Sequence, residues 1–93
     1  MKVVVSIGGS VLVPDEGPDR VDDYASVLEA LESEGHTLAA VVGGGPTARE
    51  YIAAGREHGA NEIELDQIGI AVTRLNARLL VAALGDRATP TPP

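Results

Sequence analysis

Three consecutive glycines, at positions 43–45, form the part of the sequence best suited to chemistry. They follow residues 37–42, a run of β-branched and small apolar residues that predicts a buried strand. They precede Pro46, which suits the first turn of a helix. Glycine lets a ligand approach the backbone, and a helix start presents unpaired N–H groups with a partial positive charge. The pattern predicts a phosphate-binding turn; the alternative is a plain strand-to-helix turn that uses glycine for tight packing.

Two further features bear on an anion site. Arg49 lies within about the first turn of the predicted helix, and its guanidinium offers a planar fork of donors for phosphate oxygens. A second glycine turn, at positions 8–10, ends another apolar run over residues 2–7. Alone this turn is a weak signal, because its spacing matches neither GxGxxG nor GxxxxGK[ST], and a tight strand exit explains it equally well. Two parallel strands that both end in glycines would nevertheless place both turns at the sheet edge where ligands bind.

The rest of the pattern supplies the elements that hold these turns. Apolar residues at helical spacing predict three helices, over about 19–34, 46–58 and 66–84. Residues 11–17 are rich in breakers and predict a loop, and residues 61–65 a short connection. Strand, helix and strand in this order form a βαβ unit. We therefore expect an α/β fold in which strands 2–7 and 37–42 are parallel neighbours.

The helix predicted over 66–84 carries apolar residues on more than one side. A helix of this kind is buried on more than one side, so we expect a second covering surface from another subunit or from a further part of the domain. Asp66 stands at the predicted start of this helix, where an aspartate is ordinarily a cap. Placed near the glycine turns, it could instead accept hydrogen bonds from a ribose.

Composition narrows the class of protein. The 93 residues suit one domain, and the absence of cysteine excludes disulfides and thiolate metal sites. A net charge of −7 argues against nonspecific binding to nucleic acid or to an anionic membrane. No apolar run approaches the roughly 18 residues of a membrane span and no signal peptide is recognisable, so we expect a cytoplasmic protein.

The types of charged residue in the chain indicate the kind of organism it comes from. The chain has 14 acidic residues, seven basic residues of which only Lys2 is a lysine, and no phenylalanine. These features resemble proteins of salt-loving archaea, in which high salt screens the repulsion between surface carboxylates. The alternative is an acidic mesophilic domain.

Three ordered motifs resemble the archaeal type of UMP kinase, within the amino acid kinase superfamily. They are SIGGSVL at residues 6–12, VGGGPTAREYI at 42–52 and DQIGIAVTRLNA at 66–77. The resemblance implies a three-layer sandwich around a mainly parallel sheet, of which this chain holds only the amino-terminal βαβα-α portion. Residues 1–85 would be the amino-terminal, monophosphate-binding part, and the proline-rich residues 86–93 a tail at a truncation point.

The resemblance also implies roles for individual residues. Four would contact the ATP phosphates: Gly9, Ser10, Gly45 and Arg49. Two would bind UMP: Gly44 through its backbone N–H to the phosphate, and Asp66 to the ribose. Three would support these contacts: Gly8, Gly43 and Thr73. The family's pattern implies neither a catalytic side chain nor a metal ligand in this chain.

The reaction implied is transfer of the ATP γ-phosphoryl group to UMP in pyrimidine nucleotide biosynthesis, with Mg²⁺ bound through the nucleotide phosphates. The resemblance implies a homo-oligomer, a hexamer at full length, with no nucleic-acid or membrane partner, and a chain of 93 residues that is inactive alone. Two alternatives stay open. One is another phosphotransferase of the superfamily, with acetylglutamate or isopentenyl phosphate as acceptor; the other is a non-catalytic nucleotide-binding or oligomerising remnant.

Overall fold

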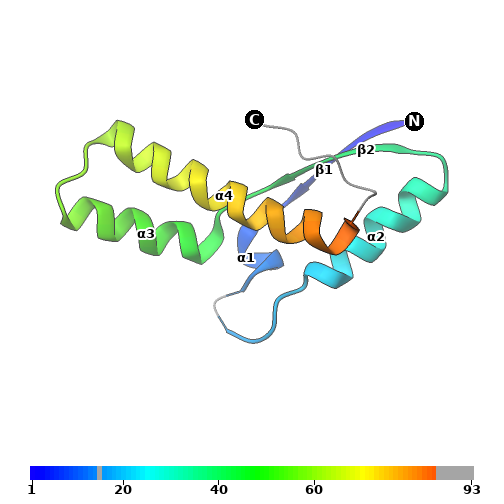
Figure 1. The fold of residues 1–93 in the computed structure, drawn as a ribbon, viewed down its shortest axis with the longest axis horizontal. Helices are drawn as coiled ribbons and strands as arrows, with labels where there is room; N and C mark the ends of the chain where they lie inside the picture. Colours follow the sequence, from blue (N-terminus) through cyan, green and yellow to red (C-terminus); the bar gives the residue numbers. More distant parts are fainter. Residues whose placement is uncertain (15, 86–93) are drawn as a thin grey trace.

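The computed structural model describes residues 1–14 and 16–85. In chain order the elements are β1 (Lys2–Ile7), α1 (Gly9–Leu12), α2 (Val21–Ser33), β2 (Thr37–Val42), α3 (Gly45–Glu57) and α4 (Glu62–Leu84) (Figure 1). The α/β class predicted from the sequence is confirmed. The interpretation of residues 86–93 as a tail lies outside the described residues.

The two strands form a parallel pair, as predicted. Their register runs from Lys2 opposite Thr37 to Ile7 opposite Val42, and α2 is the crossover between them. Because the pairing is parallel and the last residues of both strands are partners, the two glycine turns leave the sheet at the same end. This register brings residues some 35 positions apart in the chain to one edge of the sheet.

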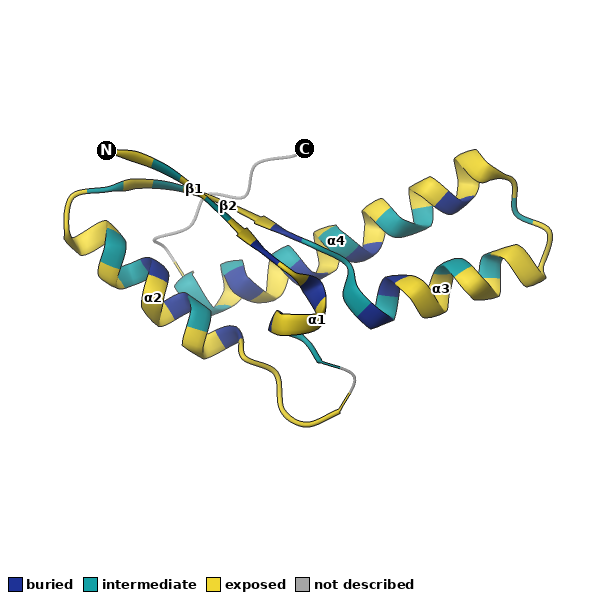
Figure 2. Cartoon of the chain, turned by 180° about the vertical axis from the view of Figure 1, so that it is seen from behind, coloured by how far each residue is buried: buried dark blue, intermediate teal, exposed yellow. Residues whose placement is uncertain are grey.

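Helices cover one face of this sheet. Seven buried residues from β1, α1, α2, β2 and α4 form the core: Ile7, Leu12, Val21, Ala25, Leu28, Val42 and Leu80. The opposite face stays open within the described residues, where Val4 is 67% and Val41 58% exposed. Figure 2 shows the strands from this uncovered side, with α4 behind them. The described residues thus form two layers of the expected three-layer sandwich, the sheet and one layer of helices.

The helices α3 and α4 form an antiparallel hairpin that extends from the sheet (Figure 1). They pack tightly at Gly55, where a Cβ atom would lie 2.8 Å from Cδ1 of Ile68 and 3.2 Å from Cδ2 of Leu65. Glycine at this position lets the two helices approach, and Leu65 is buried there. The hairpin carries the start of α3 and the middle of α4 to the end of the sheet where the glycine turns lie.

Two expectations about element boundaries are wrong. Residues 9–12, expected partly as a loop, form the short helix α1. Helix α4 begins at Glu62 rather than at Asp66, and its cap is Asn61, whose side chain accepts a hydrogen bond from the Glu64 N–H at 2.9 Å. Asp66 therefore lies inside the helix and is not a cap.

Helix α4 also qualifies the expectation about membrane spans. Within the described residues it is the one helix long and apolar enough to cross a membrane by length and composition. In its most apolar stretch of 18 residues, 17% of the residues are buried. In this structure it packs against α2 and α3, and it carries the charged residues Arg74 and Arg78 in its second half. Its buried Asn76 bonds to the backbone of the second glycine turn. These contacts are those of a packing helix in an α/β unit.

Candidate functional site

The two glycine turns meet at the carboxyl ends of β1 and β2. The Gly43 N–H donates to the carbonyl oxygen of Ile7 at 2.9 Å, which ties the second turn to the end of the first strand. A Cβ atom on Gly9 would lie 2.4 Å from the nitrogen of Gly45 and 2.5 Å from the oxygen of Gly43. No side chain fits between the turns, so glycine at position 9 is a steric requirement. The two motifs that the sequence separates form one surface of backbone.

The second turn carries unused hydrogen-bond donors. Gly44 is the N-cap of α3, and Gly45 begins the helix with φ of +63°, a conformation that favours glycine. Within the described residues the N–H groups of Gly44 and Gly45 donate no hydrogen bond. A Cβ atom on Gly44 would lie 2.4 Å from Cβ of Ala48, so a side chain is excluded there as well. Two free N–H groups at a helix start fit a phosphate group.

Helix α4 contacts this turn through hydrogen bonds to its backbone. Asn76 donates from Nδ2 to the carbonyl oxygens of Gly43 at 2.9 Å and Gly44 at 3.2 Å. Thr73, one turn earlier, would lie with its methyl group 3.6 Å from a Cβ atom on Gly44, and its hydroxyl donates to the Ile70 carbonyl. Thr73 thus lies next to the second glycine turn. Asn76 was missed as a site residue, although an asparagine among apolar residues of a helix signals a buried polar contact.

Two polar side chains flank the turns. Arg49 is exposed in α3, four residues after Gly45, and it forms no ion pair within the described residues. Ser10 is exposed in α1, next to the Gly9 that packs on the second turn. Both are accessible to a ligand at the joined turns. Arg49 carries an exposed positive charge on an otherwise acidic chain.

Asp66 lies farther from the turns. It is exposed in α4, seven residues before Thr73, which at 1.5 Å per residue is about 10 Å along the helix axis. Positions 66 and 73 fall on nearly the same side of a helix. The structure therefore places Asp66 beyond direct contact with a phosphate at the turn, on the side of α4 that faces this region. That separation is suited to another part of the same ligand.

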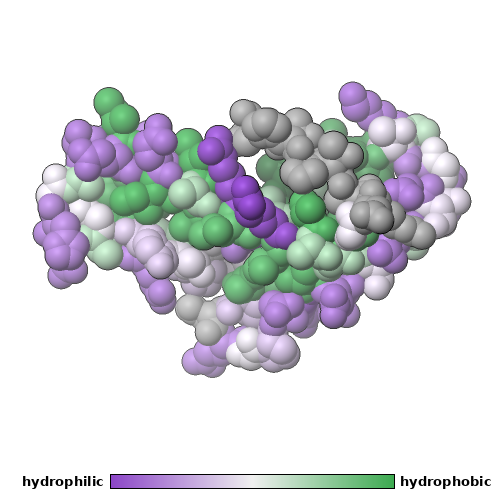
Figure 3. Space-filling model, in the orientation of Figure 1, coloured by the Kyte–Doolittle hydropathy of each residue, from purple (hydrophilic) through white to green (hydrophobic). Residues whose placement is uncertain are grey.

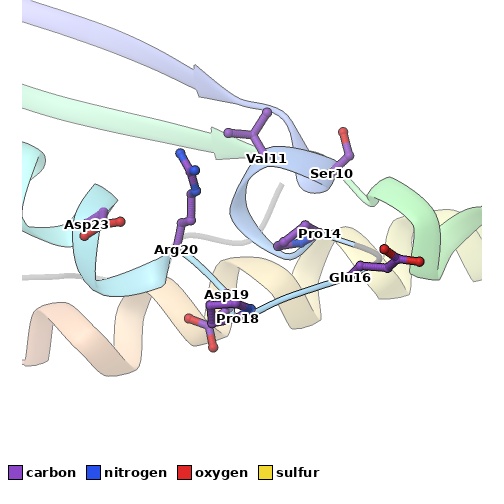
Figure 4. Close-up of a pocket in the computed structure, with 8 residues that line it drawn as sticks. All are labelled: Ser10, Val11, Pro14, Glu16, Pro18, Asp19, Arg20 and Asp23. Carbon is purple, nitrogen blue, oxygen red and sulfur yellow. The ribbon is translucent and has the colours of Figure 1, made fainter.

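A separate depression of about 630 Å³ lies beside α1 (Figure 4). It is lined by Ser10, Val11, Pro14, Glu16, Pro18, Asp19, Arg20 and Asp23. Only Ser10 belongs to the joined glycine turns, and three of its side chains are carboxylates against a single arginine. Its charge is unfavourable for phosphate, so we place the candidate site at the glycine turns instead. In the described part of the chain no group of three or more His, Cys, Asp or Glu residues could hold a metal ion.

Comparison with known proteins identifies the family. The amino acid kinase family matches residues 1–93, the whole of this chain. The chain belongs to the amino acid kinase family. It is 72% identical over 92 residues to the uridylate kinase of Haloarcula marismortui and 62% identical over 90 residues to that of Haloquadratum walsbyi. A crystal structure of the uridylate kinase from Archaeoglobus fulgidus superposes on 90% of the chain with a TM-score of 0.80 and 48% identity.

These comparisons confirm the resemblance to archaeal uridylate kinases and the amino acid kinase fold. The chain spans only 40% and 37% of the two relatives and 38% of the Archaeoglobus chain. It therefore corresponds to a portion of each. Both relatives named above come from haloarchaea, which supports the halophilic archaeal origin inferred from the excess of carboxylates and the scarcity of lysine.

Proposed function

We propose that this chain is the monophosphate-binding, amino-terminal part of a UMP kinase that transfers the γ-phosphoryl group of ATP to UMP, giving UDP and ADP. The observation that carries the proposal is the interlocking of the two glycine turns, with Gly9 in backbone contact with Gly45 and free N–H groups on Gly44 and Gly45. The relatives' name supports the choice of UMP as acceptor, since the chain is 72% identical to one uridylate kinase.

The joined turns suit a reaction that brings two phosphate-bearing molecules together. Phosphoryl transfer requires in-line positioning and charge neutralisation more than a protein nucleophile. We assign the Gly44 N–H to the UMP phosphate and place the ATP phosphates beside Gly9, Ser10, Gly45 and Arg49, with Gly8, Gly43 and Thr73 in support. Adjacent donors on one rigid surface of backbone would hold the donor and acceptor phosphates next to each other. Mg²⁺ would enter with the phosphates of ATP and neutralise part of their charge.

Asp66 would define the nucleoside end of the UMP site. Its distance of about 10 Å along α4 from Thr73 is comparable to the span from the phosphate to the far side of the ribose. A carboxylate accepts hydrogen bonds from two neighbouring hydroxyls, so it would distinguish a ribonucleotide from a bare phosphate acceptor. The rest of the proposed setting is a cytoplasmic homo-oligomer in pyrimidine nucleotide biosynthesis, a hexamer at full length, with no nucleic-acid or membrane partner.

An acceptor panel tests the proposal in a full-length protein that carries this segment. UMP, CMP, acetylglutamate, aspartate and isopentenyl phosphate are each offered with ATP and Mg²⁺ at high KCl, and ADP and the phosphorylated product are measured. We expect the rate of phosphorylation of UMP to UDP to be well above the rate with every other acceptor. Preference for a carboxylate or for isopentenyl phosphate would assign the chain to another branch of the family. Binding of nucleotides without turnover would indicate a non-catalytic member.

A further inference from the structure

Asn76 is a polar side chain buried in the interior of the structure. Its exposed fraction is 6%, and among the described residues it is the one polar or charged residue that is buried. Burying an amide costs free energy unless its donors find partners. Here Nδ2 donates to two carbonyl oxygens of consecutive residues, Gly43 at 2.9 Å and Gly44 at 3.2 Å. The contact joins α4 to a turn 32 and 33 residues earlier in the chain.

These two hydrogen bonds fix the direction of the neighbouring N–H groups. The described chain contains no cis peptide bond, and in a trans peptide the C=O and the following N–H point in opposite directions. Because Asn76 holds the carbonyls of Gly43 and Gly44 toward α4, the N–H groups of Gly44 and Gly45 must point away from α4. These are the two N–H groups that donate no hydrogen bond within the described residues.

Asn76 provides the hydrogen bond that orients the first of these peptides. The Gly44 carbonyl also accepts the Ala48 N–H at 3.4 Å, whereas the Gly43 carbonyl has Asn76 as its only donor in the described structure. Thr73 contributes no hydrogen bond to the turn, since its hydroxyl donates to Ile70. Packing against Gly9 limits the space around this peptide, and the amide of Asn76 is the group that hydrogen-bonds its carbonyl. The direction of the Gly44 N–H is therefore tied to the amide of Asn76.

We propose that Asn76 is a positioning residue that holds the Gly44 and Gly45 N–H groups toward the phosphate of the acceptor nucleotide. The inference rests on the proposed function, because it concerns the same phosphate site. It predicts that loss of the Asn76 amide weakens recognition of the phosphate and leaves recognition of the nucleoside intact. A residue with a merely structural role would affect both to the same extent.

The test compares UMP with uridine, which lacks the phosphate. In the full-length protein at high KCl, the dissociation constants of both are measured by calorimetry for wild type, Asn76→Ala and the control Leu80→Ala. Leu80 is a core residue on α4, 4% exposed, one turn beyond Asn76 and outside the turn. We expect Asn76→Ala to weaken the affinity for UMP roughly tenfold or more, as for loss of a hydrogen bond to a charged group. The affinity for uridine should stay unchanged. Leu80→Ala should keep the preference for UMP over uridine, whatever its effect on the melting temperature.

A second variant, Asn76→Leu, keeps the branched shape of the side chain with bulkier methyl groups and removes its donors, so it carries the test where the alanine variant fails to fold. An unchanged preference for UMP over uridine in the folded variants would overturn the role of Asn76 while UMP kinase activity stands. A wild-type protein that binds UMP no better than uridine would overturn the phosphate site and the proposed function together. A matched loss of UMP and uridine affinity would make Asn76 a structural residue only.

Discussion

Gly9 and Gly45 lie backbone against backbone. A Cβ atom on Gly9 would come 2.4 Å from the nitrogen of Gly45, and one on Gly45 would come 2.6 Å from the carbonyl carbon of Gly9. A Cβ atom essentially never lies so close to a non-bonded heavy atom, so neither position accepts a side chain while the other backbone stays in place. Two turns that follow different strands thereby form one rigid unit at the end of the sheet, and that unit is where the proposed donor and acceptor phosphates meet.

This contact gives a first prediction, on stability. Gly9→Ala should lower the free energy of unfolding by about 1–3 kcal/mol or more, because the methyl group meets backbone atoms that cannot rotate away. Gly8→Ala is the control: its Cβ atom would lie 3.7 Å from Cγ2 of Val11, an ordinary contact. We expect the control to change stability by less than about 1 kcal/mol. Denaturant melts of both variants measure the difference, and equal stabilities would contradict the observed packing.

A second prediction concerns Arg49. Removing its guanidinium in Arg49→Ala should cost a charge-assisted hydrogen bond to phosphate, about 1.5–3 kcal/mol, or roughly a 10- to 150-fold loss of ATP affinity. Arg56→Ala is a matched control, because Arg56 is exposed near the other end of α3, where it contacts Glu62 at 4.0 Å. Calorimetry with ATP and Mg²⁺ on full-length variants decides the matter. If the two substitutions lowered ATP affinity equally, Arg49 would act only through the net charge of the chain and not through a contact with phosphate.

A third prediction concerns salt. With 14 acidic and seven basic residues, the folded chain carries repulsion that weakens as the screening length falls from about 10 Å at 0.1 M salt to about 3 Å at 1 M. Within the described structure Arg56 and Glu62 form an ion pair at 4.0 Å, and the 3.8 Å contact of His36 with Glu34 is an ion pair only when the histidine is protonated. Few attractive pairs are therefore lost in exchange. The melting temperature should therefore rise from dilute buffer to molar KCl.

Neutralising carboxylates on α2 gives the matched comparison. The last turn of α2 contains no basic residue, so Glu29 and Glu32 add to the negative end of the helix dipole. Glu29→Gln with Glu32→Gln should raise stability in dilute buffer and reduce the dependence on KCl. A melting temperature that is flat or falls with KCl in the wild type would count against the interpretation of the acidic surface.

The sheet and its turns could be predicted from the sequence because their signals are local. Each strand is a run of β-branched and small apolar residues that stops at glycine, and a helix between two such runs favours parallel pairing. The four residues of α1 are too few to show a helical period. The start of α4 was misplaced, although Asn61 followed by Glu64 three residues later is a recognisable capping pattern.

The support of the site by Asn76 could not be predicted in the same way. An asparagine within an apolar helix indicates a buried hydrogen bond, but its partners lie 32 and 33 residues earlier and depend on how α4 packs beneath the turn. The contact between Gly9 and Gly45 is of the same kind, since it follows from the register of the strands and not from either motif alone. Residue types identified the turns, and tertiary packing determines how they act together.

A fourth prediction concerns self-association of the 93-residue chain. Figure 3 shows apolar residues gathered along α4 and between it and α3, and Leu75 and Leu79 are 60% and 46% exposed one turn apart on α4. Apolar surface of this kind favours association. The double variant Leu75→Glu with Leu79→Glu should reduce the apparent mass in light scattering at high protein concentration. Val27→Glu, at a residue 54% exposed on α2, is the control and should leave the apparent mass unchanged. A wild-type chain that stays monomeric would contradict the prediction.

The last prediction concerns Asp66, whose proposed role is to bind the ribose of UMP. It is exposed inside α4, four residues after the helix begins, so it does not cap the helix, and Asp66→Asn should leave the free energy of unfolding within about 0.5 kcal/mol of wild type. If its carboxylate accepts hydrogen bonds from the UMP ribose, the same substitution should weaken UMP binding roughly tenfold or more, because an amide replaces a charged acceptor.

Two comparisons isolate that role. ATP affinity should stay nearly unchanged in Asp66→Asn, because the proposed partner is the ribose of UMP. Glu64→Gln removes the same charge from an exposed residue two positions earlier on α4 and keeps the backbone N–H that Asn61 accepts, so it should leave both affinities as in wild type. UMP with 2′-deoxy-UMP completes the test, since loss of one ribose hydroxyl should reduce affinity in wild type and have little effect in Asp66→Asn. If Asp66→Asn binds UMP as tightly as wild type does, the carboxylate has no part in the site, and recognition of the nucleoside lies outside α4.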